Sequence, residues 1–184
     1  MLGYDWPRLH AALNDLPAAL LLVAVLFDLL GAINKRESLR AAGFWCLVAG
    51  VLGGGLAAAA GEMAEANAAH SDAAHPIMET HETLAWIVMG LFAVLALWRL
   101  ARRNAPGGRE QTAFTTAGII GVGLLAFTAR LGGDLVFEHA TGIDDHTLQH
   151  AVEERQGGHH HEEEEQLPHP DSAHAGHDST EHRH

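Results

Sequence analysis

Histidine is the side chain with which this sequence is best equipped for chemistry: 15 stand among 184 residues, beside one cysteine and 11 lysines and arginines. Neutral imidazole ligates zinc, copper, nickel and haem iron, so the residues favour metal or cofactor binding. The single cysteine excludes a disulfide framework and a zinc site built on several thiolates. A formal net charge of −12 argues against nucleic-acid binding, which needs clustered bases. The sequence also lacks the motifs of phosphate loops, nucleophile elbows, zinc proteases and covalent haem attachment.

Four apolar runs must position these histidines. They cover residues 16–33, 41–60, 83–98 and 112–129. Each approaches the roughly 20 residues that cross a bilayer as a helix, and each is apolar all round, whereas helices of soluble bundles keep a polar face. The fold class is therefore predicted to be all-α, an integral membrane four-helix bundle. The four transmembrane helices are expected near residues 16–34, 41–61, 81–101 and 112–132.

The charges between the runs predict how the bundle is oriented. Two short connections are basic, and short basic loops stay in the cytoplasm. Both termini and the acidic connection between the second and third runs are then predicted to lie outside. All 15 histidines fall on that outer side, although the orientation was predicted from the basic residues alone. The bases are Lys35, Arg36 and Arg40 in one connection, and Arg99, Arg102, Arg103 and Arg109 in the other.

The end of the chain differs from the rest in composition. Residues 151–184 hold nine acids, two bases and eight of the histidines, with few apolar residues. Such a segment cannot bury a core, so we divide the chain into a transmembrane domain, 1–150, and a disordered His/Asp/Glu-rich tail, 151–184. The tail is expected to bind transition metals weakly; a pH-sensitive polyelectrolyte and a plain solvated tail remain alternatives. Its candidate ligands are His159, His160, His161, His169, His174 and His177.

An internal repeat is suggested by an offset of 71 residues. Each half then has an outer histidine, a helix, a basic turn, a second helix and an outer glycine, which predicts two parallel hairpins related by an axis along the membrane normal. Chance alignment of low-complexity helices is the alternative. The coinciding pairs are His10 with His81, Asp28 with Arg99, Gly50 with Gly121, and Gly61 with Gly132.

Asp28 is the one carboxylate well inside a span. Intramembrane acids usually face the bundle interior and have a partner, and the repeat offers Arg99, which predicts a structural clamp between the first and third spans. A proton relay or a quinone-site acid is the functional alternative. Near the outer end, Arg130 is expected to pair with Glu62, Glu65 or Asp15.

Two motifs lie at the ends of the apolar domain: a His-x4-Asp/His-x-Pro opening at His10–Asp15–Pro17 and a Gly-Gly-x-Leu-Val-aromatic-x-His close that ends at His139. With these motifs the sequence resembles a bacterial four-helix membrane family, domain of unknown function 2231. The resemblance covers about residues 8–145. It implies a four-helix fold in the bacterial inner (cytoplasmic) membrane and no established activity. Some relatives are joined to a Rieske iron–sulfur domain, which implies a redox setting.

The outer histidines allow two kinds of cofactor. Haem b needs two facing imidazoles among apolar side chains, which His10 and His81 could supply, with His139 as a spare ligand. A zinc, copper, nickel or iron ion needs three or four converging ligands. A third interpretation is that these histidines merely bond loop carbonyls. The candidate metal ligands of the bundle are His10, His81, His139, Asp15, Glu82 and Asp134.

The sequence therefore predicts a non-catalytic redox or cofactor-carrying membrane subunit. Its expected partners are the lipid bilayer and a membrane redox complex or periplasmic electron carrier. A transition-metal homeostasis protein that uses the tail is the first alternative. A structural subunit without its own cofactor is the second.

Overall fold

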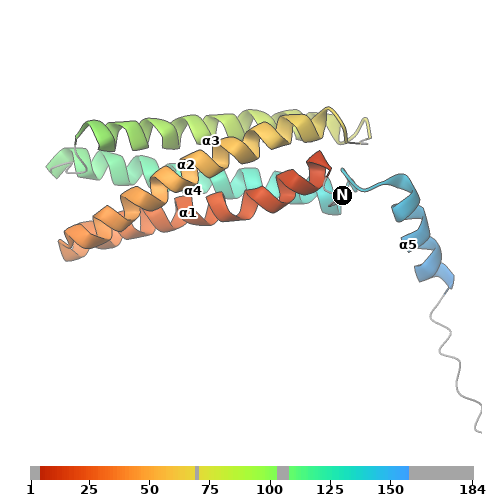
Figure 1. The fold of residues 1–184 in the computed structure, drawn as a ribbon, viewed down its shortest axis with the longest axis horizontal. Helices are drawn as coiled ribbons and strands as arrows, with labels where there is room; N and C mark the ends of the chain where they lie inside the picture. The colour runs from red at the N-terminus through yellow and green to blue at the C-terminus, as the bar shows by residue number, and fades with distance from the viewer. Residues whose placement is uncertain (1–4, 69–70, 103–107, 158–184) are drawn as a thin grey trace, which may run out of the picture. The chain divides into compact units, whose positions relative to one another are not determined.

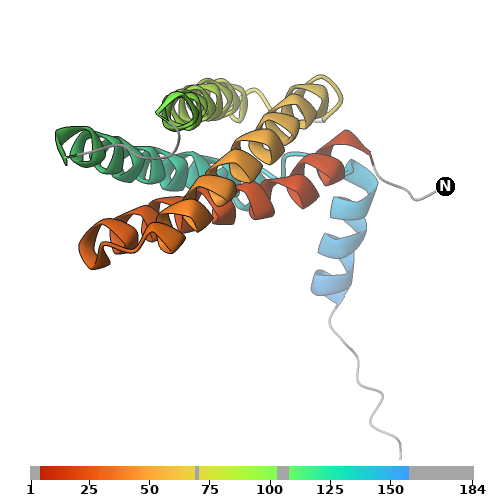
Figure 2. The same ribbon diagram turned by 60° about the vertical axis from the view of Figure 1, so that its left-hand side comes forward.

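The computed structural model describes residues 5–68, 71–102 and 108–157. Four long helices run alongside one another (Figures 1 and 2), and each is long and apolar enough to cross a membrane. This confirms the predicted all-α membrane protein with four spans. The chain divides into two compact units, residues 1–148 and 149–184. The helices are α1 (Trp6–Asn34), α2 (Glu37–Glu65), α3 (His75–Ala101), α4 (Gly108–Phe137) and α5 (Asp145–Gly157).

The first two helices form a hairpin whose ends are set by local chemistry. The Asp5 side chain caps α1 by accepting a hydrogen bond from the Arg8 backbone N–H at 3.0 Å. Lys35 ends α1 in the left-handed conformation, with φ 53°, and α2 begins at Glu37. A connection this short turns the chain back on itself. The ends of α1 and α3 and the starts of α2 and α4 lie together at one end of the bundle (Figure 1).

The helices are longer than the apolar runs from which they were predicted. α1 begins at Trp6, ten residues before the expected start at 16, and α4 continues to Phe137. A helix satisfies its own backbone hydrogen bonds, so it can extend past the hydrocarbon with polar residues in its end turns. The predicted tail boundary at 151 falls inside α5, so the first part of the expected disordered tail is helical. The six tail histidines proposed as ligands lie outside the described residues.

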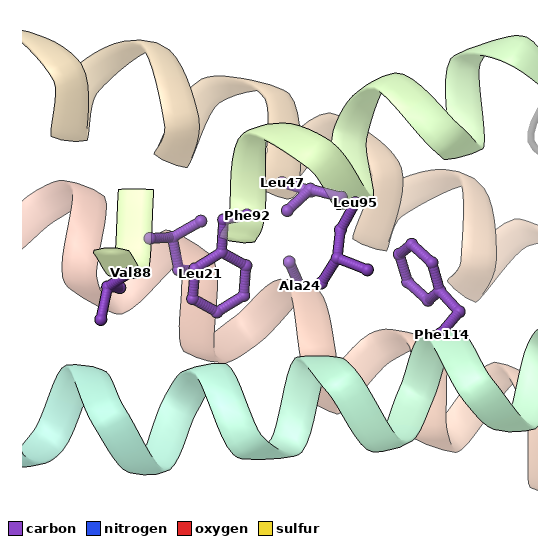
Figure 3. Close-up of a cluster of buried hydrophobic side chains, with 7 residues drawn as sticks. All are labelled: Leu21, Ala24, Leu47, Val88, Phe92, Leu95 and Phe114. Atoms are coloured by element: carbon purple, nitrogen blue, oxygen red, sulfur yellow. The ribbon is translucent and has the colours of Figure 1, made fainter. Parts of the chain in front are cut away.

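The buried residues of the two hairpins coincide at the 71-residue offset. The core between them contains Leu21 and Ala24 of α1 and, 71 residues later, Phe92 and Leu95 of α3 (Figure 3). Buried positions of α2 also coincide with buried positions of α4 at this offset, and the glycines among them allow close packing. The matching buried positions are Gly43 with Phe114, Leu47 with Gly118, Gly50 with Gly121, Ala57 with Thr128, and Ala64 with Leu135.

Three pairs of equivalent residues touch one another across the two hairpins. A residue can meet its own counterpart only near a two-fold axis, so the contacts trace a pseudo-two-fold axis along the bundle. The sequence repeat is thus expressed in the packing. The contacting pairs are His10 with His81, Asp28 with Arg99, and Arg40 with Gln111.

The Asp28–Arg99 pair is deeply buried, with side chains 3% and 1% exposed. Arg99 donates to both carboxylate oxygens of Asp28, and its second nitrogen donates to the Arg40 carbonyl at 2.6 Å. The guanidinium also lies 5.1 Å from the Phe114 ring centroid. Gly43 leaves room for the carboxylate, since a Cβ there would lie 2.8 Å from Asp28 Oδ1. The pair holds α1 and α3 together as the predicted clamp would.

The prediction that Arg130 pairs with Glu62, Glu65 or Asp15 is wrong. The Arg130 Nε lies 3.7 Å from Asp134 Oδ2, one turn further along α4, and the side chain is 75% exposed. Glu62 instead accepts a hydrogen bond from the Trp86 indole at 3.1 Å. An exposed arginine pairs most readily with an acid four residues away on its own helix, because that pair needs no other element.

Candidate functional site

At the end of the bundle opposite the Asp28–Arg99 clamp, one histidine of each hairpin bonds a backbone carbonyl of the neighbouring helix, and we call this end the histidine end. His10 lies in the second turn of α1, and its Nδ1 is 2.8 Å from the Ala57 carbonyl of α2. A Cβ on Gly61 of α2 would lie 3.0 Å from the ring, so a residue without a side chain is what lets the imidazole pack against that helix.

The second hairpin repeats this arrangement. His81 of α3 places its Nδ1 2.9 Å from the Thr128 carbonyl of α4. A Cβ on Gly132 would lie 3.0 Å from the His81 ring. The imidazole, the carbonyl that it bonds and the glycine against which it packs therefore each have a counterpart 71 residues later.

The hydrogen bonds define the protonation of both rings. A carbonyl oxygen can only accept, so Nδ1 of His10 and of His81 carries the proton. In the neutral imidazole, Nε2 is then the nitrogen with a free lone pair. Among the described residues, no group bonds either Nε2. Both rings therefore have the tautomer and the anchored orientation of metal-ligating histidines.

The two imidazoles lie next to each other, one from each hairpin, near the pseudo-two-fold axis. Their ring centroids are 6.4 Å apart and their planes are nearly perpendicular, at 88°. Both rings line two adjoining cavities at the histidine end, of about 160 and 60 Å³. The cavity walls are mostly apolar, and the larger cavity also reaches the carboxylates Glu62, Glu65 and Glu82. Glu82 and Glu65 lie close enough to hydrogen-bond each other.

The structure brings together only part of the predicted ligand set. His10, His81 and Glu82 share the larger cavity. His139 follows α4 in a turn and lines neither cavity. Asp15 is exposed on α1, and Asp134 lies beside Arg130. In the ranges that the structure describes, no three His, Cys, Asp or Glu side chains gather closely enough to hold a metal ion.

Several residues of the site were not predicted from the sequence. The two carbonyls that anchor the imidazoles belong to the backbone, which leaves no mark in residue type. Thr141 also lines the larger cavity, and its buried hydroxyl has no hydrogen-bond partner among the described residues. Met78 lines the larger cavity and Met89 the smaller. Only Gly61 and Gly132 carried a signal, through the 71-residue offset.

Fold and site together define the class: an integral membrane bundle of two helical hairpins, each contributing one anchored imidazole at the same end. A family model described as Predicted membrane protein (DUF2231) matches residues 7–145, and the chain belongs to that family. The match confirms the resemblance read from the two histidine motifs, and it spans α1 to α4. No curated protein and no solved structure matches the chain.

Proposed function

We propose that this protein is a non-catalytic, cofactor-carrying membrane subunit in which His10 and His81 ligate one metal centre, either a transition-metal ion or the iron of haem b. The observation that carries the proposal is the pair of anchored imidazoles. Each donates Nδ1–H to a backbone carbonyl and keeps Nε2 free, and the two come from equivalent positions on the pseudo-two-fold axis.

The separation of the rings suits a shared ion. A metal–nitrogen bond of about 2.0 Å plus about 1.1 Å from Nε2 to the ring centroid gives about 6.2 Å for two imidazoles on opposite sides of one ion. The observed centroid distance is 6.4 Å. The alternative role for these histidines, bonding carbonyls, rests on the same contacts, since each imidazole bonds a carbonyl within a helix of its own hairpin. A shared ion adds a role for the Nε2 that each ring keeps unbonded among the described residues.

The size of the site favours a bare ion over haem. Pockets for drug-sized ligands occupy about 300–1,000 Å³, whereas the larger cavity here has about 160 Å³. An ion needs far less room than a porphyrin, which would have to push the hairpins apart at the histidine end. This comparison also supports a second candidate function, transition-metal homeostasis, in which the bundle holds an ion that the histidine-rich tail collects.

The setting proposed for the site follows from the basic connections. They favour an orientation with both termini, and hence the histidine end, on the outer side of the membrane. In the bacterial inner membrane that the family resemblance implies, that side is the periplasm. A metal centre there lies within reach of a membrane redox complex or a periplasmic electron carrier, which are the partners we propose. A structural subunit without a cofactor is the function that remains if the site binds nothing.

The test is an absorption spectrum and a metal analysis of the full chain purified in mild detergent. A Soret band that shifts on dithionite reduction identifies haem, and about one metal per chain in excess of the metal held by the tail, without that band, identifies an ion. Either signal should disappear in His10→Phe/His81→Phe, which keeps two rings but removes their nitrogens. It should persist in His146→Ala, an exposed control. A wild-type chain that never holds a cofactor, or a double variant that retains it, contradicts the proposal.

A further inference from the structure

The histidine end offers few ligands, and this limits which ion it can hold. Resting on the proposed function, we propose that the metal is copper in its monovalent state, Cu(I), held between His10 and His81. No third His, Cys, Asp or Glu gathers with them within the described residues. Zinc sites take four ligands and octahedral sites six, whereas a d¹⁰ monovalent ion such as Cu(I) is satisfied by two nitrogens in a line.

The separation of the two rings is closer to the value for a linear arrangement than to the value for a bent one. Two imidazoles that bind one ion through Nε2 would have their centroids about 5.1 Å apart at a tetrahedral angle and about 6.2 Å apart in a line. The rings of His10 and His81 are 6.4 Å apart. Their perpendicular planes, at 88°, are compatible with linear ligation, because each ring can rotate about its metal–nitrogen bond without affecting the other.

The charge of the ion matters because the cavity walls are apolar. The free energy of moving an ion out of water rises with the square of its charge, so a divalent ion between two neutral imidazoles is penalised about four times as heavily as a monovalent one. The nearby acids do not remove this difference. Glu62 is exposed and accepts from Trp86, and Glu65 and Glu82 lie close enough to hydrogen-bond each other. They attract cations to the larger cavity without completing a ligand set.

A methionine lines each of the two cavities that the histidines share. Met78, 7% exposed, lines the larger cavity, and Met89 lines the smaller one. Met89 packs closely on α2, since a Cβ on Gly54 would lie 2.6 Å from its sulfur. Thioethers are soft, polarisable donors that prefer Cu(I) to zinc or iron. Two neutral nitrogens with thioether sulfur nearby form an environment that selects a soft monovalent ion.

The inference is tested by anaerobic titration of the detergent-purified full chain with Cu(I) against a chromophoric Cu(I) chelator. The wild type should hold one equivalent that the chelator removes last. In His10→Phe/His81→Phe that equivalent should bind roughly 100-fold more weakly or vanish, while the weaker tail sites are unchanged. His146→Ala is the matched control. Met89→Leu, which preserves volume, should weaken the site by a smaller factor. Unaltered elution and thermal unfolding show that the variants are folded.

The possible outcomes separate the inference from the proposed function. One histidine-dependent equivalent of Zn²⁺ or Ni²⁺ held more tightly than Cu(I), or a histidine-dependent Soret band, overturns the copper assignment and leaves the proposed cofactor site standing. Equal Cu(I), Zn²⁺ and Ni²⁺ binding by the wild type and the double variant, with no haem in either, overturns both. Preferential retention of Cu(I) that requires both histidines supports both.

Discussion

Removing one partner of the Asp28–Arg99 pair should destabilise the bundle severely. In Asp28→Leu, the Arg99 guanidinium, 1% exposed, keeps its hydrogen bond to the Arg40 carbonyl but loses its counter-ion. An uncompensated buried charge costs about 3–5 kcal/mol. Leucine branches at the same carbon as aspartate, so the substitution changes the charge with little change of shape in the space beside Gly43.

Removing both charges should restore most of the loss. Asp28→Leu/Arg99→Met replaces the pair with apolar side chains of similar shape, and such exchanges are often neutral or stabilising. The double variant also leaves the Arg40 carbonyl without its 2.6 Å partner, which costs about 1 kcal/mol. It should therefore unfold within about 1–2 kcal/mol of the wild type, with a coupling of at least about 2 kcal/mol between the two sites.

The assay is equilibrium unfolding in mixed detergent micelles, followed by circular dichroism and tryptophan fluorescence. Asp15→Leu, on the same helix but exposed, is the matched control and should change stability by no more than about 0.5 kcal/mol. The clamp would be refuted if Asp28→Leu lost less than about 1 kcal/mol, or if the double variant were as unstable as the worse single variant.

Three further changes test other parts of the structure. Gly61→Val introduces a branched side chain where even a Cβ lies 3.0 Å from an imidazole, so cofactor affinity should fall about 10–100-fold in titration, whereas Gly55→Val, with nothing within 4 Å, should leave it unchanged. Equal effects would remove the glycine from the site. Gln111→Ala deletes the acceptor of the 2.7 Å bond from Arg40, and unfolding should lose about 1 kcal/mol; no loss would mean that this bond contributes nothing. A cysteine introduced between α3 and α4 should react with an impermeant maleimide only after cells are permeabilised. Labelling of that cysteine in intact cells would contradict the predicted orientation.

The four spans and the repeat were predictable because both leave marks in residue type. Long uncharged runs reveal helices in a bilayer. The 71-residue offset was visible in residues that pack against one another, such as Asp28 with Arg99. The helix ends were not predictable to the residue, because polar end turns such as those of α1 carry no apolar signal. The change of backbone direction after Phe137 could not be predicted from the sequence either.

Which residues belong to the site could be predicted only in part from the sequence. Asp15 could have been set aside, since five residues along a helix turn it about 140° from His10, whereas Asn14 and Pro17 lie within about 40° of that face. Asn14 and Pro17 do line the smaller cavity with His10. His139 could not be excluded in this way, because its position depends on how the chain turns after α4 rather than on helical spacing.

The most direct test of a metal centre between His10 and His81 is X-ray absorption at the edge of whichever metal the purified full chain retains. We predict two imidazole nitrogens at about 2 Å from the metal in the wild type, with their multiple-scattering pattern lost in His10→Phe/His81→Phe. A wild-type spectrum without histidine nitrogens, or one that is the same in the double variant, would contradict the account.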